Sequence, residues 1–186
     1  MSGTQLYIIG TLHSGYTPEQ ELREMLENIN PEFIFLELPP QDIAKSKRAD
    51  DPRQEMFFAY HWAQEQGITV EFFDTPEGDS FNEGYSEESP EYKQLLAETE
   101  EKLKHYSWKD LNRTKNINKF KHPFEETLID MNKREQRQEQ MVKNIKHAMP
   151  NSAKVVVLTG PFHLKYLAMK FPEARFPLGD QLTPDI

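Results

Sequence analysis

Short apolar runs recur along the chain, and each is followed by a turn that contains glycine, proline or an acidic residue. The runs at 5–9, 33–38, 68–73 and 153–159 are rich in Val, Ile, Leu and Phe, which is typical of buried strands. Helical patterns separate them, and strand–helix–strand units build parallel sheets. The pattern therefore predicts a single α/β domain over 1–186, with a mostly parallel central sheet, flanking helices and a site at the carboxyl ends of the strands.

Apolar residues at helical spacing predict the helices of this domain. Thr17 as N-cap and Pro18 at the first helical position predict a helix that ends at Asn30. Further helices are expected at about 51–66, 90–106, 124–149 and 163–171.

The segment 75–90 is acidic, contains glycine and offers little material for packing. Long segments of this kind inside compact domains are often binding loops or are disordered. We expect a flexible loop here, or a lid over a site.

Composition narrows the classes of function. The net charge of −9 argues against binding to nucleic acid, because a phosphate backbone attracts cationic surfaces. The absence of cysteine excludes disulfides, thiolate metal sites and cysteine nucleophiles. The N-terminus has no signal-peptide pattern, and no apolar run approaches the roughly 20 residues that span a bilayer. We therefore expect a cytoplasmic protein without a membrane partner. Its oligomeric state, a homodimer included, stays open.

Two copies of one short motif carry the strongest functional signal. Gly10-Thr-Leu-His13 and Gly160-Pro-Phe-His163 each follow a buried strand. Ligands of parallel α/β sheets bind in the crevice beyond the carboxyl ends of the strands. Glycine at such a position permits a tight turn or a close approach of the backbone to a ligand. We expect both histidines to point into one crevice.

Carboxylates end the two other strands on the same side. Glu37 follows a buried run, where a carboxylate is costly unless it is paired or bound to something, and Asp74 begins an Asp-Thr-Pro turn. Two imidazoles with one or two carboxylates would suit a divalent metal such as manganese, cobalt, zinc or iron. Without a metal, the same groups could serve as a general base and an orienting carboxylate. Turn chemistry alone could also explain Asp74.

The long helix adds two cations near its apolar stripe. At helical spacing, Arg134 and Arg137 project close to Met141 and toward the buried side. Long cations placed in this way can bind an anionic group, or their heads can reach past the stripe into solvent. The helical register alone does not choose between the two arginines.

Four segments, taken in order, resemble the TraB/PrgY and Tiki superfamily, which is distantly related to erythromycin esterases and ChaN-like proteins. They are Ile8-Ile-Gly-Thr-Leu-His13, Phe35-Leu-Glu37-Leu, Arg137-Gln-Glu-Gln-Met141 and Val155-Val-Val-Leu-Thr-Gly-Pro-Phe-His163-Leu. Two features depart from the family pattern: Leu-Pro-Pro follows Glu37, and Gln138 stands where an acidic residue is often found.

The resemblance implies an α/β fold with His13, Glu37, Arg137 and His163 in one pocket. It also implies a hydrolase of a peptide or ester-like bond, acting on a small molecule or peptide. One branch of relatives suggests a divalent metal (Mn, Co or Zn) on His13, Glu37 and His163, and the esterase branch suggests a histidine base without metal. Arg137 would hold a carboxylate or stabilise developing negative charge. The alternative is a non-enzymatic protein that sequesters a small ligand, peptide or metal in the same pocket.

Overall fold

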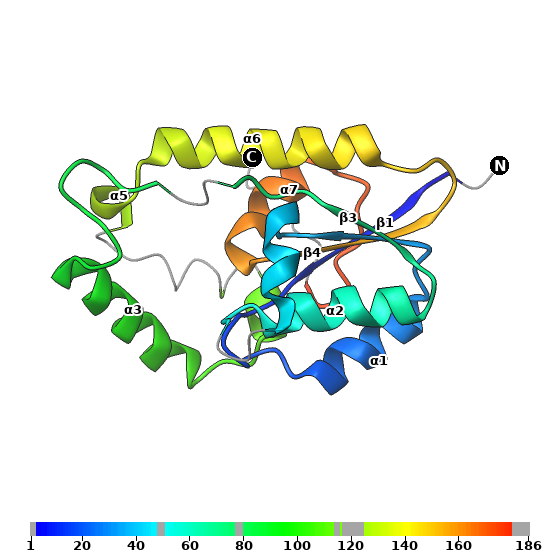
Figure 1. Cartoon of the computed structure of the whole chain (residues 1–186), viewed down its shortest axis with the longest axis horizontal. Helices are drawn as coiled ribbons and strands as arrows, with labels where there is room; N and C mark the ends of the chain where they lie inside the picture. The colour runs from blue at the N-terminus through cyan, green and yellow to red at the C-terminus, as the bar shows by residue number, and fades with distance from the viewer. Residues whose placement is uncertain (1–2, 48–50, 77–79, 114–115, 117–124, 180–186) are drawn as a thin grey trace.

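Four parallel strands form one sheet at the centre of the protein (Figure 1). The computed structural model describes residues 3–47, 51–76, 80–113, 116 and 125–179. The strands lie in the order β1-β4-β2-β3, so the last strand in sequence sits between the first two. Their bounds are β1 Gln5–Gly10, β2 Phe33–Leu36, β3 Thr69–Phe72 and β4 Lys154–Thr159. The predicted α/β fold with a parallel sheet and flanking helices is confirmed.

Helices cover both faces of the sheet (Figure 1). One layer holds α1 Glu19–Ile29 and α2 Gln54–Glu65; the other holds α6 Met131–Ala148 and α7 Leu164–Lys170. On β4, Val156 and Leu158 pack in the cluster with α1 and α2, whereas Val155 and Val157 pack with α6 and α7. A strand buried on both faces reads as a continuous apolar run, which is why β4 was the plainest strand in the sequence.

The remaining helices are short or peripheral. They are α3 Pro90–Leu103, α5 Glu125–Leu128 and the 3-10 segments η1 Pro40–Lys47, η2 Asp110–Asn112 and η4 Pro161–His163. No side chain of α3 is buried, and this helix lies apart from the sheet (Figure 1). Within the described ranges, every helix is too short or too polar to cross a bilayer.

The prediction of one continuous helix at 124–149 is wrong in one respect, because the structure divides this segment into α5 and α6. The side chain of Asp130 accepts hydrogen bonds from the backbone N–H groups of Asn132 and Lys133, so α6 begins afresh behind its own N-cap. Ile129, just before this cap, forms an isolated antiparallel bridge with Phe81. A capping aspartate within an otherwise helical pattern thus marked the break.

The expected N-cap at Thr17 is also wrong. Helix α1 begins at Glu19, and Pro18 occupies the N-cap position without a side-chain hydrogen bond. The hydroxyl of Thr17 instead accepts a hydrogen bond of 2.7 Å from the backbone N–H of Leu12. This bond closes the turn that carries His13.

The acidic segment 75–90 is fastened through its residues 80–82 to the end of α5 and the break before α6. The Asn82 amide donates to the backbone oxygens of Thr127 and Ile129 at 2.9 and 3.1 Å. Residues 77–79 lie outside the described residues, and the expectation of a flexible loop or lid stays a prediction.

Candidate functional site

The carboxyl ends of all four strands contribute to one polar cluster. Glu37 follows β2 and Asp74 follows β3, while the turns with His13 and His163 follow β1 and β4. An open pocket of about 240 Å³ lies at this edge. Its lining residues are His13, Glu37, Pro39, Asp42, Arg53, Asp74, Thr75, Pro76 and Arg137. His163 does not line this pocket, but its ring contacts the carboxylate of Glu37.

The carboxylate of Glu37 is surrounded by donors. Its Oε2 accepts from the Thr159 hydroxyl and, at 2.7 Å, from the Gly160 backbone N–H. Its Oε1 lies 3.3 Å from Nε2 of His163 and 3.5 Å from Nη2 of Arg137. Burial alone would raise the pKa of this carboxyl. The charge and hydrogen bond of His163, then the Arg137 charge and the Thr159 hydroxyl, outweigh burial and hold the pKa of Glu37 well below its usual range.

Arg137 links α6 to two strand ends. Its Nε and Nη2 donate to Oδ1 and Oδ2 of Asp74, both at 2.9 Å. Such a bidentate pair fixes orientation as well as distance. The sequence placed both arginines near the buried side, but the pocket lining contains Arg137 and not Arg134. Asp74, for which a turn alone was an open alternative, lies within the cluster.

His163 uses both ring nitrogens within the protein. Its Nδ1 lies 3.0 Å from the amide nitrogen of Gln138, and its Nε2 contacts Glu37. A proton on Nε2 is directed at Glu37, whereas the role of Nδ1 depends on the tautomer of the ring and on the orientation of the Gln138 amide. Gln138 was noted in the sequence only as a departure from an acidic residue, and the structure gives it this contact.

His13 presents a different environment. Its side chain is 41% exposed, and its Nδ1 lies 2.7 Å from Oε1 of Glu55, a side chain that is only 2% exposed. Its Nε2 makes no hydrogen bond or ion pair to any residue that the structure describes. The ring therefore lines the pocket with Nδ1 held by Glu55 and Nε2 without a partner among the described residues.

Opposing influences act on the protonation of His13. Burial lowers its pKa, and so does the positive charge of Arg53. The hydrogen bond and charge of Glu55, with the charge of Glu37, outweigh both, so the pKa of His13 lies above its ordinary value of 6.5. Sequence reasoning missed Glu55. Its position next to Met56, within the helix predicted at about 51–66, was the only signal that the sequence offered.

A second ion cluster, also missed from the sequence, forms the rim of the pocket. Arg53 donates to Oδ2 of Asp42 at 2.6 Å and to both carboxylate oxygens of Asp51 at 2.9 and 3.0 Å. The bonds to Asp51 and Asp42 raise the pKa of Arg53, so this cation is held and permanently charged.

Gly10 and Gly160 of the two Gly-x-x-His motifs differ in the space available for a side chain. A Cβ on Gly10 would lie 2.8 Å from Cδ1 of Leu164 and 3.2 Å from Cα of Pro161. A Cβ on Gly160 would meet nothing nearer than 3.7 Å, at Oε2 of Glu37. The first turn therefore needs glycine for a close approach of two chain segments, whereas the second does not need it for space.

A divalent metal on His13, Glu37 and His163 stays a prediction, although the partners of Glu37 and His163 do not favour it. Across the described ranges, no group of three or more His, Asp or Glu side chains is placed to hold a metal ion. Both nitrogens of His163 are engaged, and the Arg137 guanidinium already lies at Oε1 of Glu37, where a second cation would be repelled.

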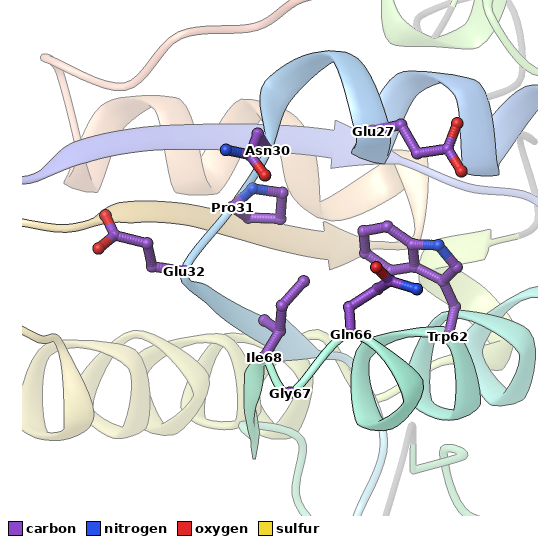
Figure 2. A pocket seen from close by; sticks show the side chains of 8 residues that line it. All are labelled: Glu27, Asn30, Pro31, Glu32, Trp62, Gln66, Gly67 and Ile68. Carbon is purple, nitrogen blue, oxygen red and sulfur yellow. The ribbon is translucent and has the colours of Figure 1, made fainter.

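A second pocket, of about 400 Å³, lies at the opposite edge of the sheet, where the chain enters β2 and β3 (Figure 2). It is lined by Glu27, Asn30, Pro31, Glu32, Trp62, Gln66, Gly67 and Ile68. This lining contains no histidine, lysine or arginine. It holds none of the residues singled out from the sequence.

No protein-family model, no curated protein and no solved structure matches this chain. The resemblance read from the four motifs therefore stays a prediction, and the chemistry of the site has to be argued from its own geometry.

Proposed function

We propose that the protein is a hydrolase that cleaves an ester-like or peptide bond in a small substrate, with His13 as the general base. One observation carries the proposal. The half-exposed ring of His13 lines a polar pocket, and its Nε2 has no partner among the described residues. The polar atoms of Glu37 and His163, by contrast, contact other protein groups. The contact with Glu55 raises the pKa of His13 above its ordinary value, which strengthens the ring as a proton acceptor.

The proposed reaction needs two proton transfers at one atom. Nε2 of His13 accepts a proton from a water molecule while the water oxygen forms a bond to the substrate carbonyl carbon. When the bond from this carbon to the leaving group breaks, the imidazolium returns the proton to the leaving group. The ring ends in its starting state, and the acid product carries the water oxygen.

Arg137 has a supporting part in this scheme. Its guanidinium keeps Glu37 and Asp74 in place and so shapes a wall of the pocket that His13 also lines. Its positive charge at the wall also favours negative charge that develops on the carbonyl oxygen. Two carboxylates already share this charge, so anchoring the wall is the larger contribution.

A hydrolysis screen tests the proposal. Chelator-treated protein is incubated with 4-nitrophenyl acetate and butyrate and with short peptides, beside His13→Asn and the control His147→Asn, an exposed histidine of α6. We expect turnover in the wild type and in His147→Asn, and a loss of roughly 10²- to 10⁴-fold in His13→Asn. Saturable binding of these compounds without product would overturn the proposal in favour of a sequestering protein.

A further inference from the structure

Glu55 is the buried carboxylate that touches the ring of His13. It lies in the first turn of α2, it is 2% exposed, and its Oε1 is 2.7 Å from Nδ1 of His13. The hydroxyl of Thr11 reaches the same oxygen at 3.4 Å. Burying a carboxylate is costly unless charges or donors compensate it. Here the compensation comes from His13 and from the positive end of the α2 helix.

The second oxygen of Glu55 argues against a purely structural role. Oε2 is buried and has no hydrogen-bond partner among the described residues. A carboxylate in a first helical turn commonly accepts from backbone N–H groups, yet Glu55 accepts no such bond from the part of the chain that the structure describes, and the N-cap residue Arg53 makes no side-chain cap hydrogen bond. The contact with His13 is therefore the main interaction that accounts for a buried acid at this position.

Backbone hydrogen bonds on either side of His13 fix the position of its turn relative to Glu55. The N–H of Ser14 donates to the oxygen of Pro52 at 2.6 Å, which ties the His13 turn to the chain just before α2. The N–H of Thr11 donates to the oxygen of Thr159 at 2.8 Å, which ties the same turn to β4. Both partners of the His13–Glu55 contact are thus held by rigid elements.

We propose that Glu55 is the positioning residue of His13: it holds the neutral ring with its proton on Nδ1 and so leaves the lone pair of Nε2 facing the pocket. The role in catalysis rests on the function proposed above for His13. The role in fixing the ring does not, since it follows from the contact alone. No proton moves to Glu55 during the reaction. Its charge stabilises the imidazolium that forms when Nε2 takes a proton.

Nitrogen-15 NMR of the histidine ring tests the positioning role without any substrate. At a pH where the imidazole is neutral, the wild type should show the proton of His13 on Nδ1. Glu55→Gln, whose amide can donate as well as accept, should move protons to Nε2, while Glu55→Asp should retain the wild-type tautomer in part. The control is Glu65→Gln, an exposed carboxylate on the same helix, which should change nothing. A proton on Nε2 in the wild type would overturn the inference.

Kinetics then separate the two proposals. Where the wild type hydrolyses an ester, Glu55→Gln should lower kcat by up to the roughly 10²- to 10⁴-fold that a general base contributes, with KM nearly unchanged, and Glu55→Asp should recover part of the loss. Wild-type kcat in Glu55→Gln would overturn the positioning role. If no substrate is turned over, the function proposed for His13 fails, and the NMR result still decides the role of Glu55.

Discussion

Arg137 and Asp74 lie 63 positions apart in the sequence and meet in a bidentate pair, with Nε–Oδ1 and Nη2–Oδ2 both at 2.9 Å. The same guanidinium reaches Glu37 at 3.5 Å. One side chain of α6 thus joins the ends of β2 and β3, which are neighbouring strands. Arg137 links the two carboxylates of the pocket wall, while Thr159 and Gly160 also hold Glu37.

Arg137→Lys should weaken the wall although the charge is kept, because an ammonium cannot form the bidentate pair. We expect a loss of about 1–3 kcal/mol in the free energy of unfolding. Arg137→Met should cost more, about 3–5 kcal/mol, because it leaves two buried carboxylates without their cation. Urea unfolding measures both, with the exposed Lys143→Met on the same helix as the control. Equal stability of the two Arg137 variants and the control would contradict this account.

Glu37 should make the protein sensitive to acid. Its pKa is held below the ordinary 4.5 in the folded state, so the unfolded chain takes up this proton first as the pH falls. The stabilisation is therefore complete above 4.5 and is lost progressively as the pH falls below that value. When the free energy of unfolding is measured at a series of pH values, Glu37→Gln should reduce its fall below pH 4.5. Glu19→Gln, at an exposed site, should leave this acid dependence unchanged. An unchanged acid dependence in Glu37→Gln would count against the charge network.

The two motif glycines should respond differently to the same substitution. Gly10→Ala forces a Cβ to 2.8 Å from Leu164 and should cost about 1–3 kcal/mol of stability. Gly160→Ala meets only ordinary contacts, at a φ of −61° that alanine adopts freely, and keeps the N–H that binds Glu37. Its stability should stay close to that of the wild type. Thermal unfolding of the pair checks this, and a larger loss in Gly160→Ala would reverse the interpretation.

The side-chain amide of Asn112 pairs with the backbone N–H and oxygen of Gly10 at the end of β1, as a neighbouring strand would. Its Oδ1 accepts from the Gly10 N–H at 2.7 Å, and its Nδ2 donates to the oxygens of Gly10 and Trp108 at 2.9 and 3.1 Å. Asn112→Ala leaves these buried backbone groups unpaired and should cost at least about 1–3 kcal/mol. Asn132→Ala, at an exposed site, serves as the control in the same unfolding assay. A loss no larger than in the control would show that these bonds are dispensable.

The sequence was sufficient for features that depend on local patterns. The continuous apolar run from Val155 to Leu158 and the turns after each strand predicted the parallel sheet, and parallel strands bring their carboxyl ends to one edge. That geometry is why Glu37 could be connected with residues far along the chain. The break at Asp130 was missed because the helical pattern continues across it, whereas the structure interrupts the helix with the Asp130 cap and the Phe81–Ile129 bridge.

Partners within the site were harder to foresee from the sequence. Glu55 lies in an ordinary helical stretch, and only the approach of the His13 turn to α2 gives it a partner. Likewise, the choice of Arg137 over Arg134 depends on where α6 settles on the sheet. Contacts between side chains far apart in the sequence depend on how the helices pack on the sheet. The spacing of apolar residues along the chain carries no information about them.

The most direct test of the central claim is the pH dependence of kcat/KM for an ester substrate, measured on metal-stripped wild type and on His13→Asn. The account predicts that stripped wild type is active and that its kcat/KM rises with pH through one ionisation above 6.5, the ordinary value of a histidine. It also predicts that His13→Asn loses both the activity and this ionisation. Wild-type activity in His13→Asn, or activity that returns only when manganese, cobalt or zinc is added, would contradict it.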